Sequence, residues 1–281
     1  MIDILSHYEP ITLDEMSGIR LMNRTDTKFV TTKPMLRQLL LLAQDDYRVQ
    51  EIKGERIAPY YTVYFDTPDY AMYLRHETGH TNRQKLRIRS YVNSGLNFLE
   101  VKTKNNHGRT RKKRITMHDF DPKCPQHNIV FRPEECDFHL YDEFLTANLR
   151  YEPTLLTEKV ENHFNRITLV NKLKTERLTI DFDLEFDNIG NGKHKDMGNI
   201  VIVELKRDGL QPSPILNHLM ELRIKPMGFS KYCMGMAMTD DTLRQNRFKP
   251  RKRRVFRLNA APVPQPSAAP RHAHATPSND I

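Results

Sequence analysis

The sequence predicts an α+β fold in which a closed antiparallel β-barrel carries helices packed on its outside. The main observation is an alternation of charged and apolar residues in residues 85–89, 99–104 and 177–187. A period of two is typical of strands with one polar and one apolar face. Helical patterns elsewhere can cover the apolar faces, so the sheet can close with its charges inward. A cavity lined in this way suits a polyanion.

The N-terminal part predicts a strand, a helix and a second strand. Arg24, Asp26 and Lys28 alternate with threonines, which indicates a first strand with an inward charged face. Residues 32–44 predict a packed helix, with a threonine at the N-cap and a proline in the first turn. Residues 60–66 are rich in tyrosine and valine and predict a strong strand that ends in a turn.

A β-hairpin is predicted from residues 85–89 and 99–104, which are joined by a turn containing asparagine, serine and glycine. If the register brings the polar faces together, the hairpin holds a strip of cations around Glu100. Two interpretations stay open for the hairpin by itself: a cavity lining, or the solvated face of a one-sided sheet. The same alternation at residues 177–187 and 203–206 favours the lining.

A basic run at residues 109–114 follows the hairpin. Alone, such a run is more often a solvated or nucleic-acid-binding patch than a site. Its position directly after a strand with a charged face favours alternate members that point into the same space as the hairpin.

The C-terminal half predicts two further strands with a charged face, at residues 177–187 and 200–208, and two helices. Ser213 caps the first helix, and Ser230 and Lys231 are expected at the N-terminus of the last one, which is a natural phosphate position. On the long strand at residues 177–187 the charged side chains are all expected on the cavity face: Arg177, Asp181, Asp183, Glu185 and Asp187.

The charge balance separates a body, residues 1–243, from a tail, residues 244–281. The formal net charge is +9, and eight lysines and arginines lie within residues 244–257 without an acid, which leaves about +1 for the body. A broadly basic nucleic-acid surface on the body is therefore disfavoured. The tail is first basic and then rich in proline and alanine, so it is expected to be disordered.

The first ten residues show neither the basic start nor the apolar segment of a secretory leader, and no apolar run approaches the ~20 residues that span a membrane. The three cysteines, Cys124, Cys136 and Cys233, have no metal-finger spacing and are expected to be free thiols without a catalytic role. These observations predict a soluble protein of the cytoplasm, with a peripheral position at the inner face of the membrane as an alternative.

Seven motifs between Ile11 and Thr239 occur in the order found in one known family: RTDTKF, YFDTPDY, LRIRSY, LEVKTK, RLTIDFD, VIVELKR and FSKY. With them the chain resembles the VTC domain, the polyphosphate polymerase branch of the CYTH-like triphosphate tunnel metalloenzymes. The resemblance implies the triphosphate tunnel fold and an enzyme that transfers the terminal phosphate of ATP to a growing polyphosphate chain. Compared with the eukaryotic polymerases, the sequence shows neither a preceding phosphate-sensing domain nor membrane spans, so a stand-alone catalytic module is expected.

The resemblance also implies roles for individual residues. Lys28, Arg87, Arg89 and Lys231 would be catalytic, and Glu204 would hold Mn²⁺ or Mg²⁺. Lys112 is chosen as the cation of the basic run over its neighbours Arg111 and Lys113. The phosphate-binding residues, Lys112 included, would be Arg24, Arg75, Lys102, Lys112, Arg166, Arg177 and Ser230.

The motif at residues 24–28 departs from the hydrolase and cyclase branch, which has Glu-x-Glu-x-Lys there. Arg24 stands in place of the first acid, and this argues against simple triphosphatase activity. Two alternatives remain: a metal-dependent tripolyphosphatase or nucleoside triphosphatase, and a non-catalytic module that binds polyphosphate or RNA. The expected partners are ATP and polyphosphate. The basic tail could also contact a membrane protein or an acidic membrane surface.

Overall fold

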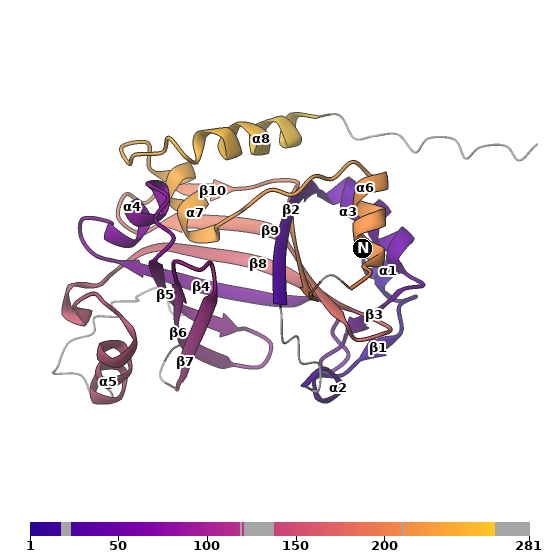
Figure 1. Ribbon diagram of the computed structural model, residues 1–281, viewed down its shortest axis with the longest axis horizontal. Coiled ribbons are helices and arrows are strands. Elements are labelled where there is room, and N and C mark those ends of the chain that lie inside the picture. Colours follow the sequence, from indigo (N-terminus) through magenta and orange to yellow (C-terminus); the bar gives the residue numbers. More distant parts are fainter. Residues whose placement is uncertain (18–23, 119, 121–137, 210, 262–281) are drawn as a thin grey trace, which may run out of the picture.

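The protein is described here by a computed structural model, which covers residues 1–17, 24–118, 120, 138–209 and 211–261 (Figure 1). One antiparallel path of hydrogen-bonded strands organises these residues. In spatial order it consists of β2 (Arg24–Thr32), β11 (Ile200–Asp208), β9 (Glu176–Asn188), β8 (Thr157–Asn171), β4 (Ala58–Asp66), β5 (Arg83–Tyr91), β6 (Leu96–Lys104) and β7 (Thr110–Met117).

Three short strands lie off this path. β3 (Tyr47–Gln50) pairs with β8 and, in parallel, with β1 (Pro10–Ile11), and β10 (His194–Asp196) pairs with β9. The helices of the described residues are α1 (Ile2–Leu5), α2 (Leu13–Ser17), α3 (Lys33–Ala43), α4 (Ala71–Glu77), α5 (Phe138–Asn148), α6 (Pro214–Glu221), α7 (Lys231–Thr239) and α8 (Lys249–Ala260), with a 3₁₀ turn at Pro153–Leu155.

The predicted hairpin is confirmed as β5 and β6, whose register pairs Arg87 with Glu100 and Lys85 with Lys102. The closed barrel is not confirmed, because β2 and β7, the two ends of the path, are not paired with each other among the described residues. The free edge of β2 is covered instead by the segment before α7, where the Met227 amide donates to the Lys28 carbonyl at 2.8 Å. A short covering segment satisfies an exposed strand edge without closing the sheet.

Two apolar clusters cover the outer face of the curved sheet, as expected. In the first, the buried leucines of α3 and α6 pack against β9 and β11, for example around Leu178 and Val203. In the second, Leu145 of α5 packs against Ile88 and Leu99 of the hairpin. These clusters fix the alternate residues of the same strands on the inner face.

α7 departs from the expectation that all helices lie outside. It is almost entirely buried and packs on the inner face, with Met236 and Tyr232 against Phe186, Ile202 and Tyr64. A close approach requires glycine at position 235, because a Cβ there would lie 2.6 Å from the Phe186 ring. α7 therefore fills one part of the inner face, and the charged residues occupy the rest.

The expected alternation of β9 is interrupted by a β-bulge at Asp183. The register with β8 shifts at this point, and Asp183 has a φ of 51°. One extra residue reverses the facing of all residues that follow. Leu184 and Phe186 therefore turn inward beneath α7. Asp183, Glu185 and Asp187 turn outward, so the prediction that they share the cavity face with Asp181 is wrong.

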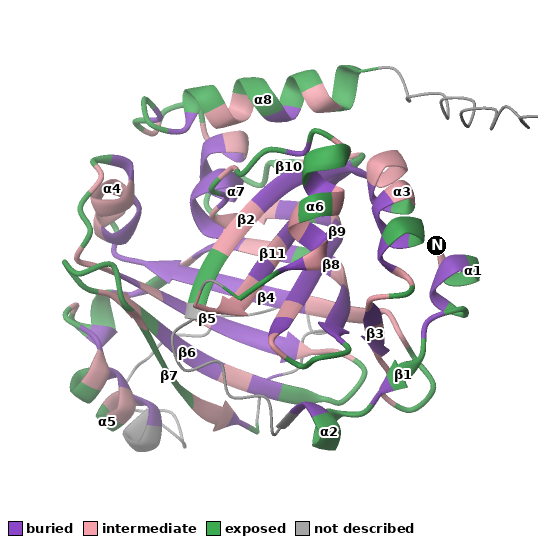
Figure 2. Cartoon of the chain, turned by 45° about the vertical axis from the view of Figure 1, so that its right-hand side comes forward, coloured by how far each residue is buried: buried purple, intermediate pink, exposed green. Residues whose placement is uncertain are grey.

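The tail was expected to lack regular structure from residue 244 onward, but α8 is a helix that packs on α7 (Figure 2). Phe248 and Val255 are buried, and the Lys252 ammonium donates to the Ala237 carbonyl at 2.6 Å. The proline- and alanine-rich residues 262–281, like Cys124 and Cys136, lie outside the described residues. Cys233 is a free and buried thiol.

Among the helices that the structure describes, none has both the length and the apolar character needed to span a lipid bilayer.

Candidate functional site

The inner face of the sheet encloses a cavity of about 710 Å³, and each of the eight strands of the path contributes to its wall. Thirteen lysines and arginines line it, against three carboxylates. The carboxylates are Asp26, Asp181 and Glu204, and the cations are Lys28, Arg83, Lys85, Arg87, Arg89, Lys102, Lys104, Lys112, Arg166, Arg177, Lys206, Lys231 and Arg251. So many cations around one space create a strong positive potential.

Ten of the twelve residues assigned by resemblance lie in this lining, and two do not. Arg75 lies on α4, and its Nη2 donates to the Asn82 carbonyl at 3.1 Å. Arg75 does not line the cavity. Arg24 begins β2 opposite Asp208, and the structure describes only its backbone. Lys112 lines the cavity, whereas its neighbours Arg111 and Lys113 do not. The functional roles of all twelve stay predictions.

Glu204 lies between two lysines of the cavity floor. Its carboxylate is 3.8 Å from the Lys28 ammonium and 3.5 Å from that of Lys206. Burial by itself would raise the pKa of Glu204, but the charges of Lys28, Lys206 and Lys102 lower it below its usual range. Glu204 is therefore ionised at neutral pH and available as an oxygen ligand.

A preformed metal site is not found, because no three His, Cys, Asp or Glu residues converge within the described part of the chain. Mg²⁺-like ions are often held by one or two carboxylates together with substrate phosphates and water. Glu204 fits this second arrangement. The residues present thus suit a metal that binds with a phosphate substrate, and not one held by the protein alone.

Asp181 is occupied by structural ion pairs. Arg166 binds it through two hydrogen bonds of 2.6 and 2.8 Å, and the Lys231 ammonium lies 2.7 Å away. Burial would raise the pKa of Asp181, but the charges of Arg166 and Lys231 lower it. Asp181 therefore fixes two cavity cations in place and is not free to bind a metal.

Glu100 holds the β5–β6–β7 wall together. It has no exposed surface, accepts from the Arg87 guanidinium at 2.6 and 2.8 Å, and pairs with the Lys112 ammonium at 2.9 Å. Burial would raise the pKa of Glu100, but the charges of Arg87, Arg89 and Lys112 lower it. This carboxylate holds the side chains of Arg87 and Lys112 in place, and both of these line the cavity.

Ser230 and Lys231 lie where they were expected, at the start of α7. The Ser230 hydroxyl accepts from the Cys233 amide as an N-cap and from the Lys85 ammonium at 2.5 Å. The carbonyl of Phe229 accepts from the Lys28 ammonium at 3.0 Å. The segment before α7 thus ties β2 and β5 together at the cavity.

Four cavity lysines have lowered pKa values, mainly through burial: Lys85, Lys102, Lys206 and Lys231. Partial withdrawal from bulk water, with the charges of Lys28 and Arg87, lowers the pKa of Lys102 to about 7 although Glu204 opposes the shift. Burial, with the charges of Lys28 and Arg83, lowers the pKa of Lys85 to about 8. A bound anion would raise the pKa of Lys85 and of Lys102 again and so favour their protonated forms.

Several lining residues were not assigned from the sequence. Arg83, Lys85, Lys104 and Lys206 follow the same alternation as their assigned neighbours, so the strand period could have identified them. Arg251 could not be found in this way, because it comes from α8 and its approach to the cavity depends on tertiary packing.

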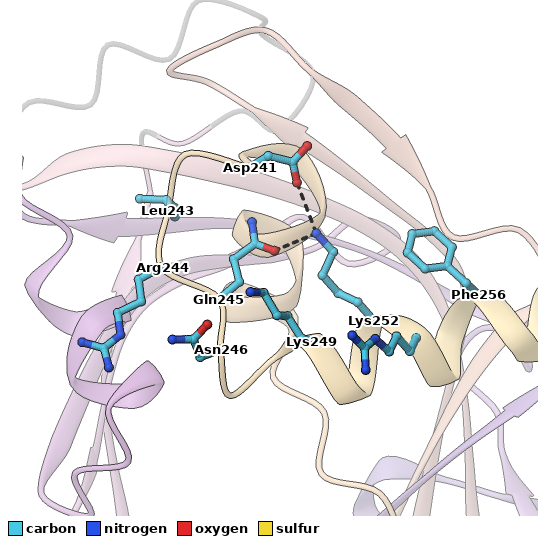
Figure 3. Close-up of a pocket in the computed structure, with 9 residues that line it drawn as sticks. Asp241, Leu243, Arg244, Gln245, Asn246, Lys249, Lys252 and Phe256 are labelled. Atoms are coloured by element: carbon cyan, nitrogen blue, oxygen red, sulfur yellow. Dashed lines mark hydrogen bonds and ion pairs between the residues drawn. The ribbon is translucent and has the colours of Figure 1, made fainter.

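A second, more open hollow of about 510 Å³ lies on the far flank of α8 (Figure 3). Its wall includes Arg244, Lys249, Arg253 and Phe256, and the Lys252 ammonium there is held by the Gln245 side chain at 2.7 Å and by Asp241 at 3.3 Å. It is separate from the cavity enclosed by the sheet, and the two share no lining residue.

Comparison with known structures finds similar chains at low sequence identity. HpAC1 from Hippeastrum, for which a dominant triphosphatase activity is described, is 16% identical, with a TM-score of 0.45 over 78% of this chain and 97% of that one. A proposed adenylate cyclase from Bacillus halodurans is 13% identical, with a TM-score of 0.43 over 74% and 96% of the two chains. PH1819 from Pyrococcus horikoshii is 12% identical, with a TM-score of 0.41 over 76% and 98%.

Among curated proteins, no sequence match was found. The model of the VTC domain matches residues 23–239, which include all eight strands of the cavity wall and α7. Since this match spans well over half of the sequence, the chain belongs to the VTC domain family.

Proposed function

We propose that the protein is a polyphosphate polymerase, which transfers the terminal phosphate of ATP to the end of an inorganic polyphosphate chain. The terminal oxygen of the chain attacks the γ-phosphorus, the bond from that phosphorus to the bridging oxygen breaks, and ADP leaves with that oxygen.

The observation that carries the proposal is the excess of cations in one cavity, thirteen against three carboxylates. The attacking oxygen is already an anion, so the transfer needs no strong general base. Its main barrier is the repulsion between two polyanions, which positioned lysines and arginines offset in the transition state. Arginine is well suited, because its planar fork binds phosphate oxygens in pairs and stays charged.

Lys28, Arg87, Arg89 and Lys231 would hold the triphosphate, and the other cations of the lining would hold the growing chain. Glu204 would bind a divalent cation, Mn²⁺ or Mg²⁺, which when bound supplies charge neutralisation at the transferred phosphate. Asp181 would keep Arg166 and Lys231 in position.

The scarcity of free carboxylates favours transfer over hydrolysis. A hydrolase of the related branch relies on an acid-rich metal site. Here Asp181 is engaged by two cations, and the described residues contain no cluster of three acids or histidines. A tripolyphosphatase or a polyphosphate-binding module is therefore an outcome of the test below and not the function proposed.

The test incubates the purified protein with ATP and Mn²⁺ and measures long-chain polyphosphate, ADP and free phosphate. Glu204→Gln and Lys28→Ala are expected to lower polymer formation at least tenfold, because they remove the metal ligand and a cation that faces it. Glu185→Gln and Lys172→Ala make the same chemical changes at exposed positions outside the cavity and are expected to retain activity.

Polymer that accumulates together with ADP, and that is lost only in the cavity variants, supports the proposal. Release of free phosphate without polymer would identify a hydrolase instead. If ATP stays intact while polyphosphate still binds, the domain is a binding module.

A further inference from the structure

α8 is fixed to the body of the protein beside the cavity. The Tyr73 hydroxyl donates to the Arg244 carbonyl at 2.9 Å, and the Asn259 side chain donates to the Met197 carbonyl at 3.0 Å. Phe248 and Val255 are buried between these contacts. The helix lies beyond the residues that the VTC domain model matches, so its position is a feature of this chain that the family match does not cover.

One residue of α8, Arg251, lines the cavity itself together with Phe248. Arg83 and Lys104, which are paired across the hairpin, also line the cavity. The charges of Lys85, Arg83, Arg251 and Lys104 all act on His76, which also lines the cavity. Arg251 therefore joins the cations of the cavity wall to the surface of α8.

The cationic surface continues along one flank of α8. Residues three apart lie on neighbouring positions of a helix surface, so Arg251, Arg254 and Arg257 form a row that begins at the cavity lining and leads away from it. Arg254 and Arg257 are exposed, and α8 contains no acidic residue. Lys249 and Arg253 occupy a different flank, beside the hollow of Figure 3.

We propose that this row binds the part of a linear polyphosphate chain that extends out of the cavity. The proposal rests on the proposed function for the identity of its ligand. Two observations favour this occupant: the row is continuous with the cationic lining through Arg251, and its charge is complementary to a chain with one negative charge on each unit.

A membrane surface is a poorer occupant for this flank. Stable binding of a helix at a lipid interface needs apolar side chains beside the cations. The exposed large apolar residue of α8 within the described residues is Phe256, and it lines the hollow on the other flank. Among the described residues of α8, no exposed large apolar side chain lies on the flank of the arginine row.

The experiment compares Arg254→Gln/Arg257→Gln with Lys249→Gln/Arg253→Gln, which removes the same charge from the other flank of the same helix. Binding of labelled long-chain polyphosphate and of tripolyphosphate, which fits within the cavity, is measured by fluorescence anisotropy at several salt concentrations. The row variant should bind the long chain about fourfold to sixteenfold more weakly, because each of the two exposed charge contacts contributes roughly a factor of two to four. Its salt dependence should also become less steep.

Tripolyphosphate binding should be the same in both variants and in the unmodified protein, and thermal unfolding should show that both variants are folded. Equal losses in the two variants, or no loss in either, would overturn the proposal. So would a row variant that loses binding to vesicles containing phosphatidylserine while its affinity for polyphosphate is unchanged.

The assay is independent of synthesis. If the protein makes no polymer from ATP but the row variant selectively loses long-chain binding, the proposed function fails and this inference stands. If polymer is made and the two variants bind it equally well, the inference fails and the function stands.

Discussion

Glu100 lies beneath the cavity wall, between the Arg87 guanidinium and the Lys112 ammonium, with no exposed surface of its own. Removal of one member of a buried ion pair leaves the other charge without compensation, at a cost of about 3–5 kcal/mol when both are fully buried. Lys112 is partly exposed and can be solvated again. Arg87 is the member that would lose its counter-charge.

Glu100→Gln is therefore expected to lower the free energy of unfolding by about 2–4 kcal/mol. The measurement is urea unfolding followed by circular dichroism. Glu185→Gln, an exposed site on β9, serves as the matched control and should change the stability by less than about 0.5 kcal/mol. A variant at position 100 as stable as the control would show that Glu100 does not balance these cations.

Lys102 and Lys85 make a prediction about pH, since their pKa values are lowered to about 7 and about 8. Phosphate binds the protonated lysines, so the affinity for tripolyphosphate should fall as pH rises through this range. Calorimetry at pH 8, in two buffers with different ionisation enthalpies, should detect proton uptake on binding. Lys102→Met should reduce the uptake, and binding without any uptake at pH 8 would contradict the assignment.

The stability of the free protein should respond to pH in the opposite sense. Both lysines have folded-state pKa values below the ordinary 10.5, so the unfolded chain binds more protons between about pH 7 and 10. The contribution of these groups to the free energy of unfolding therefore rises with pH in this window and falls as pH drops toward 7.

At the scale of elements, α7 depends on its close approach to β9. A methyl group at position 235 would lie 2.6 Å from the Phe186 ring, which is too close for any contact. Gly235→Ala is expected to destabilise the protein by about 1–3 kcal/mol through overpacking, although alanine favours helices. Thermal unfolding tests this. Addition of Phe186→Leu should recover part of the loss, and a single variant with an unchanged midpoint would mean that the helix can shift freely.

The strands and the hairpin could be predicted because charged and apolar residues alternate with a period of two within each short segment. The alternation placed Arg87 and Lys102 on one face, and the structure has them there. The bulge at Asp183 could not be predicted, because nothing in the regular pattern of β9 marks the extra residue. The inward turn of Leu184 depends on α7, which packs from a distant part of the sequence.

At the scale of the whole molecule, the path of strands could be expected but its closure could not. Whether β2 meets β7 depends on which segment covers the edge of β2, and residues near Met227 do so. The helix at Lys249–Ala260 was missed for a related reason. A run of like charges predicts disorder when it is considered alone, but here Phe248, Val255 and Lys252 find partners on α7 and around it.

The concentration of thirteen cations in one cavity has a consequence for the lifetime of the protein in a cell. An anion that binds the folded form and not the unfolded chain stabilises it by mass action, by about 2.7 kcal/mol at a hundred times its dissociation constant. Unfolded chains are removed by proteases, so the steady-state abundance depends on this equilibrium. If polyphosphate occupies the cavity as proposed, the amount of the protein would then rise with the concentration of that ligand.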